Sequence, residues 1–312
     1  MQAVGVNSFG GPEALEVVEL PDPVVGPGQL LVRVHAATVN PTDTYVRNGA
    51  RAEHQRKDPP PYVPGMDAAG VLEAIGDGVD TDLEVGDHVM AVVLPDGAHG
   101  GYCQRLALPA GSVARMPAGA SFAEASTLPM NGLTARLALD LLDVPSGGTV
   151  AVTGAAGSFG GYCVQLAKAD GLRVIADASE ADEALVRDLG ADVVVRRGDD
   201  VAERILEHAP DGVDGLCDGS VQDEALFPAI RDGGGFAAVR GLKVEAPRGI
   251  RMHRVWVSRY LEDQERLDRL RQQVEDGQVT LRVAQTFPMD RAAEAHRLLE
   301  AGGIRGRLVI EL

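Results

Sequence analysis

Residues 150–176, VAVTGAAGSFGGYCVQLAKADGLRVIA, decide the fold of this chain of 312 residues. The stretch begins with an apolar, β-branched run at 150–153 and turns through a glycine-rich loop at 154–160. A helical apolar pattern follows, Gly171 ends it, and a second strand is expected at 173–176. A parallel crossover of this kind brings backbone N–H groups and a helix N-terminus against a pyrophosphate. The sequence therefore predicts a dinucleotide-binding unit.

The glycine loop departs in one place from the strict G-x-G-x-x-G pattern. Ala155 stands at the first glycine position, and Gly157 and Gly160 hold the other two. Many α/β proteins use glycine at strand-to-helix turns for packing alone, so the loop becomes specific only with its flanking strands and helix. The alternative of a packing turn stays open.

Composition limits the class of protein. The apolar content of 45% is typical of a soluble globular chain. The opening residues MQAVGVNSFG carry no basic and apolar leader, and no stretch approaches the length of a membrane span. A formal net charge of -17 disfavours nucleic acid and anionic membranes as partners. We therefore expect a cytoplasmic protein that binds neither nucleic acid nor membranes.

The three cysteines, Cys103, Cys163 and Cys217, lie far apart within apolar patterns. We expect them to be small buried side chains in a reducing compartment. Because the chain has no C-x-x-C pair, cysteines cannot build a structural zinc lobe.

The pattern along the chain changes near its middle. Up to about residue 118 it is β-rich, and from residue 150 strands alternate with helices, which predicts a doubly wound parallel sheet. Ser121 and Glu124 have the spacing of a capping box, so a helix should begin there and end at Pro129. The last strand, 307–312, is expected to return to the first domain. Strands of the second part are predicted at 150–153, 174–176, 192–195, 215–218 and 235–240.

Seven segments, spread in order over nearly the whole chain, resemble the zinc-independent quinone oxidoreductases of the medium-chain dehydrogenase/reductase superfamily. They are 39–49, 62–70, 86–89, 128–135, the glycine loop with 165–168, 189–192 and 302–308. The resemblance implies an α/β protein with a GroES-like, β-rich catalytic domain (1–120 and 276–312) and a Rossmann doubly wound parallel-sheet domain (121–275). It also implies a homodimer or higher oligomer joined through the Rossmann sheet, with the homodimer expected, and reduction by NADPH.

Zinc-dependent members of the superfamily place a cysteine within the stretch 40–43 of this chain and a His-Glu pair at Met66 and Asp67. Neither ligand set is present here, because Met66 is a poor zinc ligand and Asp67 alone cannot hold the ion. We therefore expect no metal and a substrate polarised by hydrogen bonds. A quinone or an enone, which already accepts hydride through conjugation, suits such a site better than a simple alcohol.

By the same resemblance, Asn40, Asp43 and Tyr45 lie on the substrate side of the nicotinamide. Tyr45 is the candidate donor to the oxyanion formed by hydride addition, because a phenol keeps its proton at neutral pH. The alternative, that Tyr45 only lines or gates the pocket, stays open. Asn40 and Asp43 have the alternative role of fixing the loop through Asx-turns, which we favour for Asp43.

The resemblance also assigns cofactor contacts. Thr134 matches the position that contacts the nicotinamide, and the alternative is a helix hydroxyl bonded to its own backbone. The pyrophosphate contacts are expected in the glycine loop, at Gly154, Ala155, Gly157, Ser158, Phe159 and Gly160.

Choice between NADPH and NADH depends on the residues after the second strand. NADPH-dependent members surround the 2′-phosphate with a Ser, a Lys and a later Tyr; here Ser179 is kept, Asp182 takes the Lys position, and Arg197 stands near the Tyr position. An arginine fork binds phosphate bidentately and would replace the missing cation. Against this, Asp177 ends the strand near the place where NAD enzymes hold the ribose hydroxyls. We expect NADPH, with NADH as the alternative.

The function predicted from these features is hydride transfer from NADPH to a quinone or an α,β-unsaturated carbonyl without zinc. A biosynthetic enoyl reductase of the same fold is one alternative. A non-catalytic dinucleotide-binding sensor or partner protein is the other.

Overall fold

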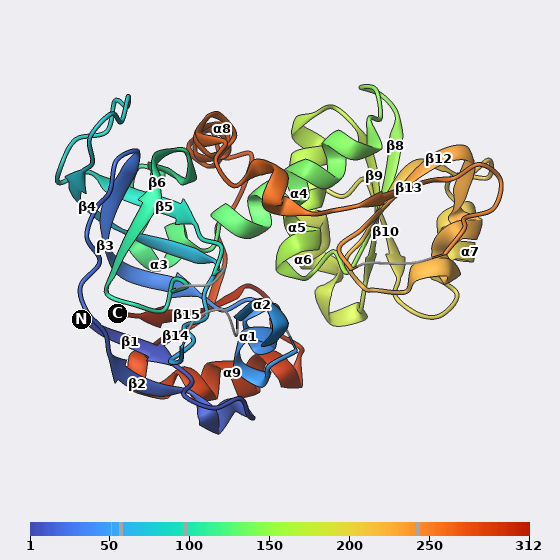
Figure 1. The fold of residues 1–312 in the computed structure, drawn as a ribbon. Coiled ribbons are helices and arrows are strands. Elements are labelled where there is room, and N and C mark those ends of the chain that lie inside the picture. Colours follow the sequence, from blue (N-terminus) through green and yellow to red (C-terminus); the bar gives the residue numbers. More distant parts are fainter. Residues whose placement is uncertain (51, 56–58, 96–98, 241–243) are drawn as a thin grey trace. The chain divides into compact units, whose positions relative to one another are not determined.

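The computed structural model describes residues 1–50, 52–55, 59–95, 99–240 and 244–312, which form two compact units (Figure 1). Unit 1 comprises Met1–Met130 and Arg259–Leu312, and unit 2 comprises Asn131–Ser258. Unit 2 is thus an insertion in the chain of unit 1. The helices at 122–126 and 264–275 both pack against strands of unit 1. The domain limits expected from the sequence, 120/121 and 275/276, stay a prediction.

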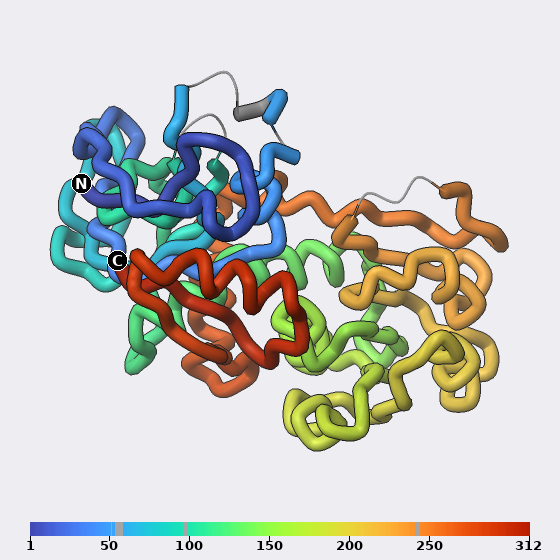
Figure 2. The backbone as a smooth tube through the Cα atoms, turned by 90° about the horizontal axis from the view of Figure 1, so that it is seen from below, coloured from blue at the N-terminus to red at the C-terminus, as the bar shows by residue number. Residues whose placement is uncertain are grey.

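Unit 1 is built on a mostly antiparallel sheet with the strand order β14-β15-β3-β4-β5-β7, and β6 pairs with β3 at its side. The last strand, β15, pairs antiparallel with β3, with Val309 opposite Thr38, so its predicted return to the first part of the chain is confirmed. In Figure 2 the red C-terminal segment accordingly runs beside the blue N-terminal one. The strands are β3 (Gln29–Thr38), β4 (Asp67–Ile75), β5 (His88–Val92), β6 (Arg105–Pro109), β7 (Val113–Arg115), β14 (Val283–Pro288) and β15 (Arg307–Glu311), with β1 (Gln2–Gly5) and β2 (Glu16–Glu19) in a separate pair.

Helices pack against the strands of unit 1, and α3 lies on the central strands β3 and β4. The α-helices are α1 (Asp43–Asn48), α2 (Ala52–Gln55), α3 (Phe122–Ser126), α8 (Gln264–Glu275) and α9 (Ala292–Ala301), and the 3-10 turns are η1 (Pro12–Ala14), η2 (Ala110–Ser112), η5 (Val257–Tyr260, which crosses the unit limit) and η6 (Met289–Arg291). The capping box is confirmed, because the Ser121 hydroxyl accepts from the Glu124 amide at 3.2 Å and the Glu124 carboxylate accepts from the Ser121 amide at 2.8 Å.

The expectation that Pro129 ends this helix is wrong. Helix α3 ends at Ser126, and Pro129 is the first residue of the next helix, α4 (Pro129–Leu142). Proline suits the first turn of a helix, where its missing N–H would have no intrahelical partner. The same residue type that stops one helix here begins another.

Unit 2 is the doubly wound α/β domain predicted from the glycine-rich stretch. Its strands pair in the parallel order β10-β9-β8-β11-β12-β13, and α-helices connect β8 to β9, β9 to β10 and β10 to β11. Buried Ala151, Ile175, Leu216 and Phe236, each 0% exposed, form its core. The elements are β8 (Thr149–Thr153), α5 (Ser158–Ala169), β9 (Arg173–Ala178), η3 (Glu180–Asp182), α6 (Glu183–Asp188), β10 (Val193–Arg196), α7 (Val201–Leu206), β11 (Val213–Asp218), η4 (Asp223–Ala229), β12 (Ile230–Ala238) and β13 (Arg251–Arg254).

All three cysteines are buried and carry free thiols, as the sequence predicted. Of the helices in the described parts of the chain, none combines the length and the apolar character that crossing a bilayer requires.

Candidate active site

The turn between β8 and α5 requires glycine at two positions. Gly154 has φ +67, and a Cβ there would lie 2.6 Å from the carbonyl carbon of Gly219. A Cβ on Gly160 would lie 2.4 Å from the Gly154 oxygen. Gly157 is the N-cap of α5, and a glycine has no side chain with which to cap the helix. The loop therefore approaches α5 closely and places glycine at the helix N-terminus, which fits a nucleotide pyrophosphate.

A loop that the sequence analysis missed lies against the glycine turn. The Asp218 carboxylate, at the end of β11, accepts from the Thr153 hydroxyl at 2.8 Å and from the amides of Val221 at 2.8 Å and Asp223 at 2.9 Å. Val221 and Asp223 have φ 59 and 53, a conformation that is strained for a β-branched side chain. The signal in the sequence was an acid at the carboxyl end of a buried parallel strand, followed at once by Gly219.

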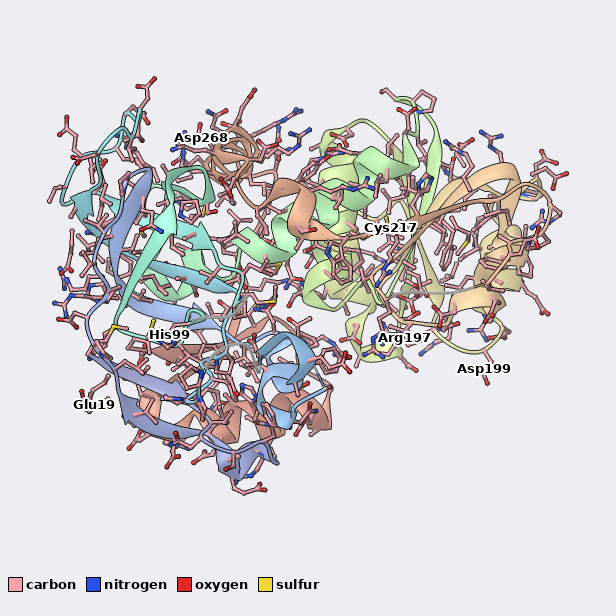
Figure 3. The ribbon with its side chains drawn as sticks, in the orientation of Figure 1. Glu19, His99, Arg197, Asp199, Cys217 and Asp268 are labelled. Carbon is pink, nitrogen blue, oxygen red and sulfur yellow. The ribbon has the colours of Figure 1, made fainter. Side chains whose placement is uncertain are left out.

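The two residues that favoured different cofactors are bonded to each other. Arg197, which is labelled in Figure 3, follows β10, and its Nε donates to Asp177 Oδ2 at 2.9 Å. The other Asp177 oxygen accepts from the Ala155 amide in the glycine loop at 3.1 Å, and the side chain is 0% exposed. Arg197 is therefore tied to the glycine loop through a buried carboxylate, while 35% of its own side chain stays exposed.

The remaining cofactor candidates lie around the same strand ends and on α4. The Ser179 hydroxyl donates to Asp182 at 2.5 Å. Asp182, which stands where NADPH-dependent members have a lysine, therefore orients the serine. Ser158, Phe159 and Thr134 are half-buried, Thr134 on α4. The Phe159 ring packs on the Asp218 loop, where a Cβ on Gly219 would lie 3.1 Å from it.

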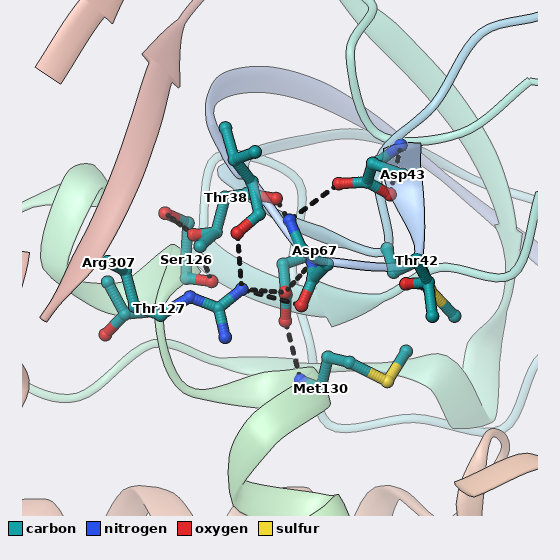
Figure 4. Close-up of polar contacts among 12 residues, drawn as sticks. Thr38, Thr42, Asp43, Asp67, Ser126, Thr127, Met130 and Arg307 are labelled. Carbon is teal, nitrogen blue, oxygen red and sulfur yellow. Dashed lines mark hydrogen bonds and ion pairs between the residues drawn. The ribbon is translucent and has the colours of Figure 1, made fainter. Parts of the chain in front are cut away.

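In unit 1, the positions that hold zinc ligands in zinc-dependent relatives form a hydrogen-bonded network (Figure 4). Asn40 Nδ2 donates to Asp67 Oδ2 at 2.8 Å, and Arg307 Nη2 donates to Asn40 Oδ1 at 2.7 Å. Asp67 Oδ1 accepts from the Met130 amide at 2.6 Å, and Arg307 lies 3.4 Å from Asp67 Oδ2. Burial raises the pKa of Asp67, and the nearby Arg307 opposes this. Among the described residues, no group of three His, Cys, Asp or Glu side chains could hold a metal ion.

Asp43 fixes the turn that begins at Asn40. Its carboxylate accepts from the Asn40 amide at 2.8 Å, the Gly65 amide at 3.1 Å and the Tyr102 hydroxyl at 2.9 Å. The side chain is 0% exposed, and burial raises the pKa of Asp43 to about 7. Tyr45 lies two residues further on α1 and is half-buried. Tyr102 and Arg307 were missed by the sequence analysis, since nothing local marks them.

Two family models match the chain. The alcohol dehydrogenase GroES-like domain covers residues 26–136, and the zinc-binding dehydrogenase model covers residues 189–310. The quinone oxidoreductase of Rattus norvegicus is 31% identical over 100% of this chain and 98% of that protein. The chloroplastic NADPH-dependent alkenal/one oxidoreductase of Arabidopsis thaliana is 30% identical over 99% of this chain and 79% of that protein.

A solved structure agrees with these sequence relatives. The mycobacterial protein Rv1454c in complex with NADPH has a TM-score of 0.87 and 30% identity over 100% of both chains. The chain belongs to the quinone oxidoreductase branch of the medium-chain dehydrogenase/reductase superfamily, a family of oxidoreductases, and its GroES-like and Rossmann parts are those of that fold.

Proposed function

We propose that the chain is an NADPH-dependent oxidoreductase that reduces a quinone or an α,β-unsaturated carbonyl without zinc. The observation that carries the proposal is the network of Asn40, Asp67 and Arg307. Asn40 and Asp67, which stand where zinc-dependent relatives have zinc ligands, are hydrogen-bonded to each other and to Arg307. A substrate in such a site needs its own conjugation to accept hydride. The names of the rat and Arabidopsis relatives support both the acceptors and the cofactor.

The residues proposed to hold NADPH all belong to unit 2. The glycine loop from Gly154 to Gly160 and the N-terminus of α5 suit the pyrophosphate, and Thr134 is the proposed contact of the nicotinamide. Ser179 and Arg197 are proposed at the 2′-phosphate, with Asp177 orienting the arginine. When bound, NADPH supplies the hydride.

The proposed chemical group of unit 1 is Tyr45. Its phenol would donate a hydrogen bond or a proton to the substrate oxygen, where negative charge develops. Asn40 and Asp43 are proposed as positioning residues, because their side chains are buried and bonded within the protein.

Assembly and location belong to the same proposal. We propose a cytoplasmic homodimer joined through the edge strand β13, with residues 121–275 as the nucleotide-binding domain. In support, β13 is the last strand in the order of its sheet and pairs with β12 on one side. Exposed Trp256 follows it, with the Arg254 guanidinium 4.6 Å from the ring centre. The Val255 amide donates to Ala238 of β12, so the amide of the preceding residue, Arg254, faces the open edge. Light scattering on the wild type and on an Arg254→Pro variant tests the dimer, because proline cannot donate to a neighbouring strand.

The test of the activity is oxidation of NADPH and NADH by the purified protein with quinones, enones and an enoyl thioester as acceptors. We expect faster turnover with NADPH and a quinone or an enone, unchanged by a metal chelator. A strong preference for the thioester would favour the biosynthetic enoyl reductase. Nucleotide binding detected by fluorescence, without turnover of any acceptor, would instead favour the non-catalytic sensor.

A further inference from the structure

Four buried side chains of unit 1 form a closed ring that includes Asp43. The Tyr102 hydroxyl lies 2.9 Å from Asp43 Oδ2 and 3.2 Å from Nε2 of His296, which is on α9. Nδ1 of His296 lies 3.3 Å from Nη1 of Arg47. Each of the four side chains is 3% exposed or less. Asp43 and Arg47 are one turn apart on α1, so the helix itself closes the ring.

The chemistry of the four groups fixes every proton in this ring. Arginine has only donors, so Arg47 donates to His296 Nδ1, and the proton of the neutral imidazole must be on Nε2. Nε2 then donates to the Tyr102 oxygen, and the Tyr102 hydroxyl donates to Asp43. Burial, and then Arg47, lowers the pKa of His296 to about 3, which agrees with a neutral ring. All the bonds therefore point toward the Asp43 carboxylate.

The ring holds a geometry and does not conduct protons. At its outer side, Arg47 Nη2 donates to Oε1 of Glu300 at 2.5 Å, and the Glu300 side chain is 41% exposed. Because the guanidinium keeps its protons at any ordinary pH, no proton can pass from Glu300 through Arg47 to Asp43. Arg47 is instead the first donor of the ring, held on its outer side by Glu300 and donating on its inner side to His296.

The element that the ring holds is α1, which has six residues and is too short to be stable by itself. Asp43 fixes its first residue and Arg47 its fifth, and Tyr45 lies between them. We propose that Arg47, His296 and Tyr102 are positioning residues that keep Asp43 an acceptor and thereby hold α1, with Tyr45, in the geometry needed for reduction. This inference rests on the proposed function, in which Tyr45 is the donor.

The charged and titratable groups around Asp43 give the inference a pH dependence. They are Tyr102, Asp67 on β4 and Arg307 on β15, with His296 and Arg47 one bond further away. The Asp43 carboxylate accepts three hydrogen bonds, from the amides of Asn40 and Gly65 and from the Tyr102 hydroxyl. If Asp43 were protonated, its own O–H would face one of these donors, and that hydrogen bond would be lost. Removing the Tyr102 hydroxyl raises the pKa of Asp43 further, because that bond lowers it.

The test compares Tyr102→Phe, His296→Gln and His296→Leu with the wild type. Glutamine keeps a donor toward Tyr102, leucine keeps none, and Tyr62→Phe is the matched control, because Tyr62 stacks on Phe9 outside the ring. The two measurements are hydrogen exchange of the α1 amides, which requires no substrate, and kcat with NADPH and a quinone as a function of pH.

In Tyr102→Phe and His296→Leu we expect α1 to exchange about tenfold faster and the acidic limb of the kcat profile to move up by about one pH unit. The glutamine variant should lie between these and the wild type, and the control should not change. In a Tyr45→Phe background, Tyr102→Phe should have no further effect on kcat.

Unchanged exchange of α1 in a folded Tyr102→Phe protein would overturn the inference, as would faster exchange with an unmoved pH limb. A wild type that reduces no acceptor would overturn the proposed function instead. The exchange measurement still decides whether the ring holds α1, so the two failures are distinguishable.

Discussion

At the scale of single residues, the pairing of Asp177 with Arg197 changes how the cofactor preference is understood. The sequence suggests that the two side chains compete, one for ribose hydroxyls and one for a phosphate. In the structure the buried carboxylate orients the guanidinium by a bond of 2.9 Å, and a third of Arg197 stays open to solvent. An acid at position 177 is thus compatible with phosphate binding, because its carboxylate already accepts hydrogen bonds from Arg197 and from the Ala155 amide.

This pairing predicts the effect of Arg197→Ala on nucleotide affinity. We expect the Kd for NADPH to rise about tenfold or more, since a hydrogen bond to a charged group contributes about 1.5–3 kcal/mol, while the Kd for NADH changes little. Fluorescence titration with both nucleotides measures this. Arg196→Ala is the matched control, because Arg196 pairs with the exposed Glu180. An equal loss for both nucleotides would mean that Arg197 acts only through Asp177 on the glycine loop.

Tyr45→Phe is the residue-scale test of the chemistry. If the phenol donates a proton during reduction, kcat should fall by roughly 10²-fold or more, with a smaller change in KM. Stopped-flow measurement of NADPH oxidation separates the chemical step from product release. A changed KM with unchanged kcat would leave Tyr45 only as a wall of the pocket.

At the scale of elements, the turn from β8 to α5 allows a graded prediction. A Cβ on Gly160 would lie 2.4 Å from a backbone oxygen, whereas one on Gly157, whose φ is -71, would lie 3.1 Å from the same oxygen. We expect Gly160→Ala to lower the free energy of unfolding by about 1–3 kcal/mol and to abolish NADPH binding, because backbone cannot move aside as a side chain can. Gly157→Ala should destabilise less. Chemical denaturation of the two variants measures the difference, and equal effects would contradict the close approach.

Elements with local signals could be predicted from the sequence. Turn chemistry and apolar periodicity indicated β8, α5 and β9, and the spacing of Ser121 and Glu124 indicated the start of α3. The end of that helix was misplaced, because a proline fits equally after one helix and at the start of another. The strained loop after Asp218 was not predicted, since left-handed conformations at Val221 and Asp223 result from bonds to that carboxylate.

At the scale of the whole molecule, the part of the site that escaped prediction is the part made by distant residues. Arg47 and His296 are 249 positions apart, and Asp67 and Arg307 are 240 apart. Each pair meets only after β15 has joined β3 and α9 has packed against the same unit. A single sequence contains no local pattern that announces such pairs, so the network could not be derived from residue spacing.

Two buried groups of the ring, His296 and Asp43, change the stability of the protein in opposite directions as pH changes. The pKa of His296 is lowered by burial from 6.5 to about 3, so the unfolded chain binds the extra proton and stability rises with pH across that window. The pKa of Asp43 is raised by burial from 3.8 to about 7, so the folded chain binds the extra proton and stability falls with pH across its window. Between pH 3.8 and 6.5 the two slopes oppose each other.

Replacing His296 by glutamine removes the pH dependence of the unfolding free energy that is due to the imidazole and leaves the one that is due to Asp43. We expect His296→Gln to destabilise the protein most at pH 6.5 and above, and the loss to shrink as pH falls toward 4, by at most about 1.4 kcal/mol per pH unit. Urea unfolding of wild type and variant at a series of pH values measures the difference, with His208→Gln as the control, since His208 is exposed after α7. A loss that is independent of pH would mean that His296 contributes packing alone. A loss that grows toward low pH would mean that the folded protein carries a protonated imidazole, which the Arg47 bond forbids.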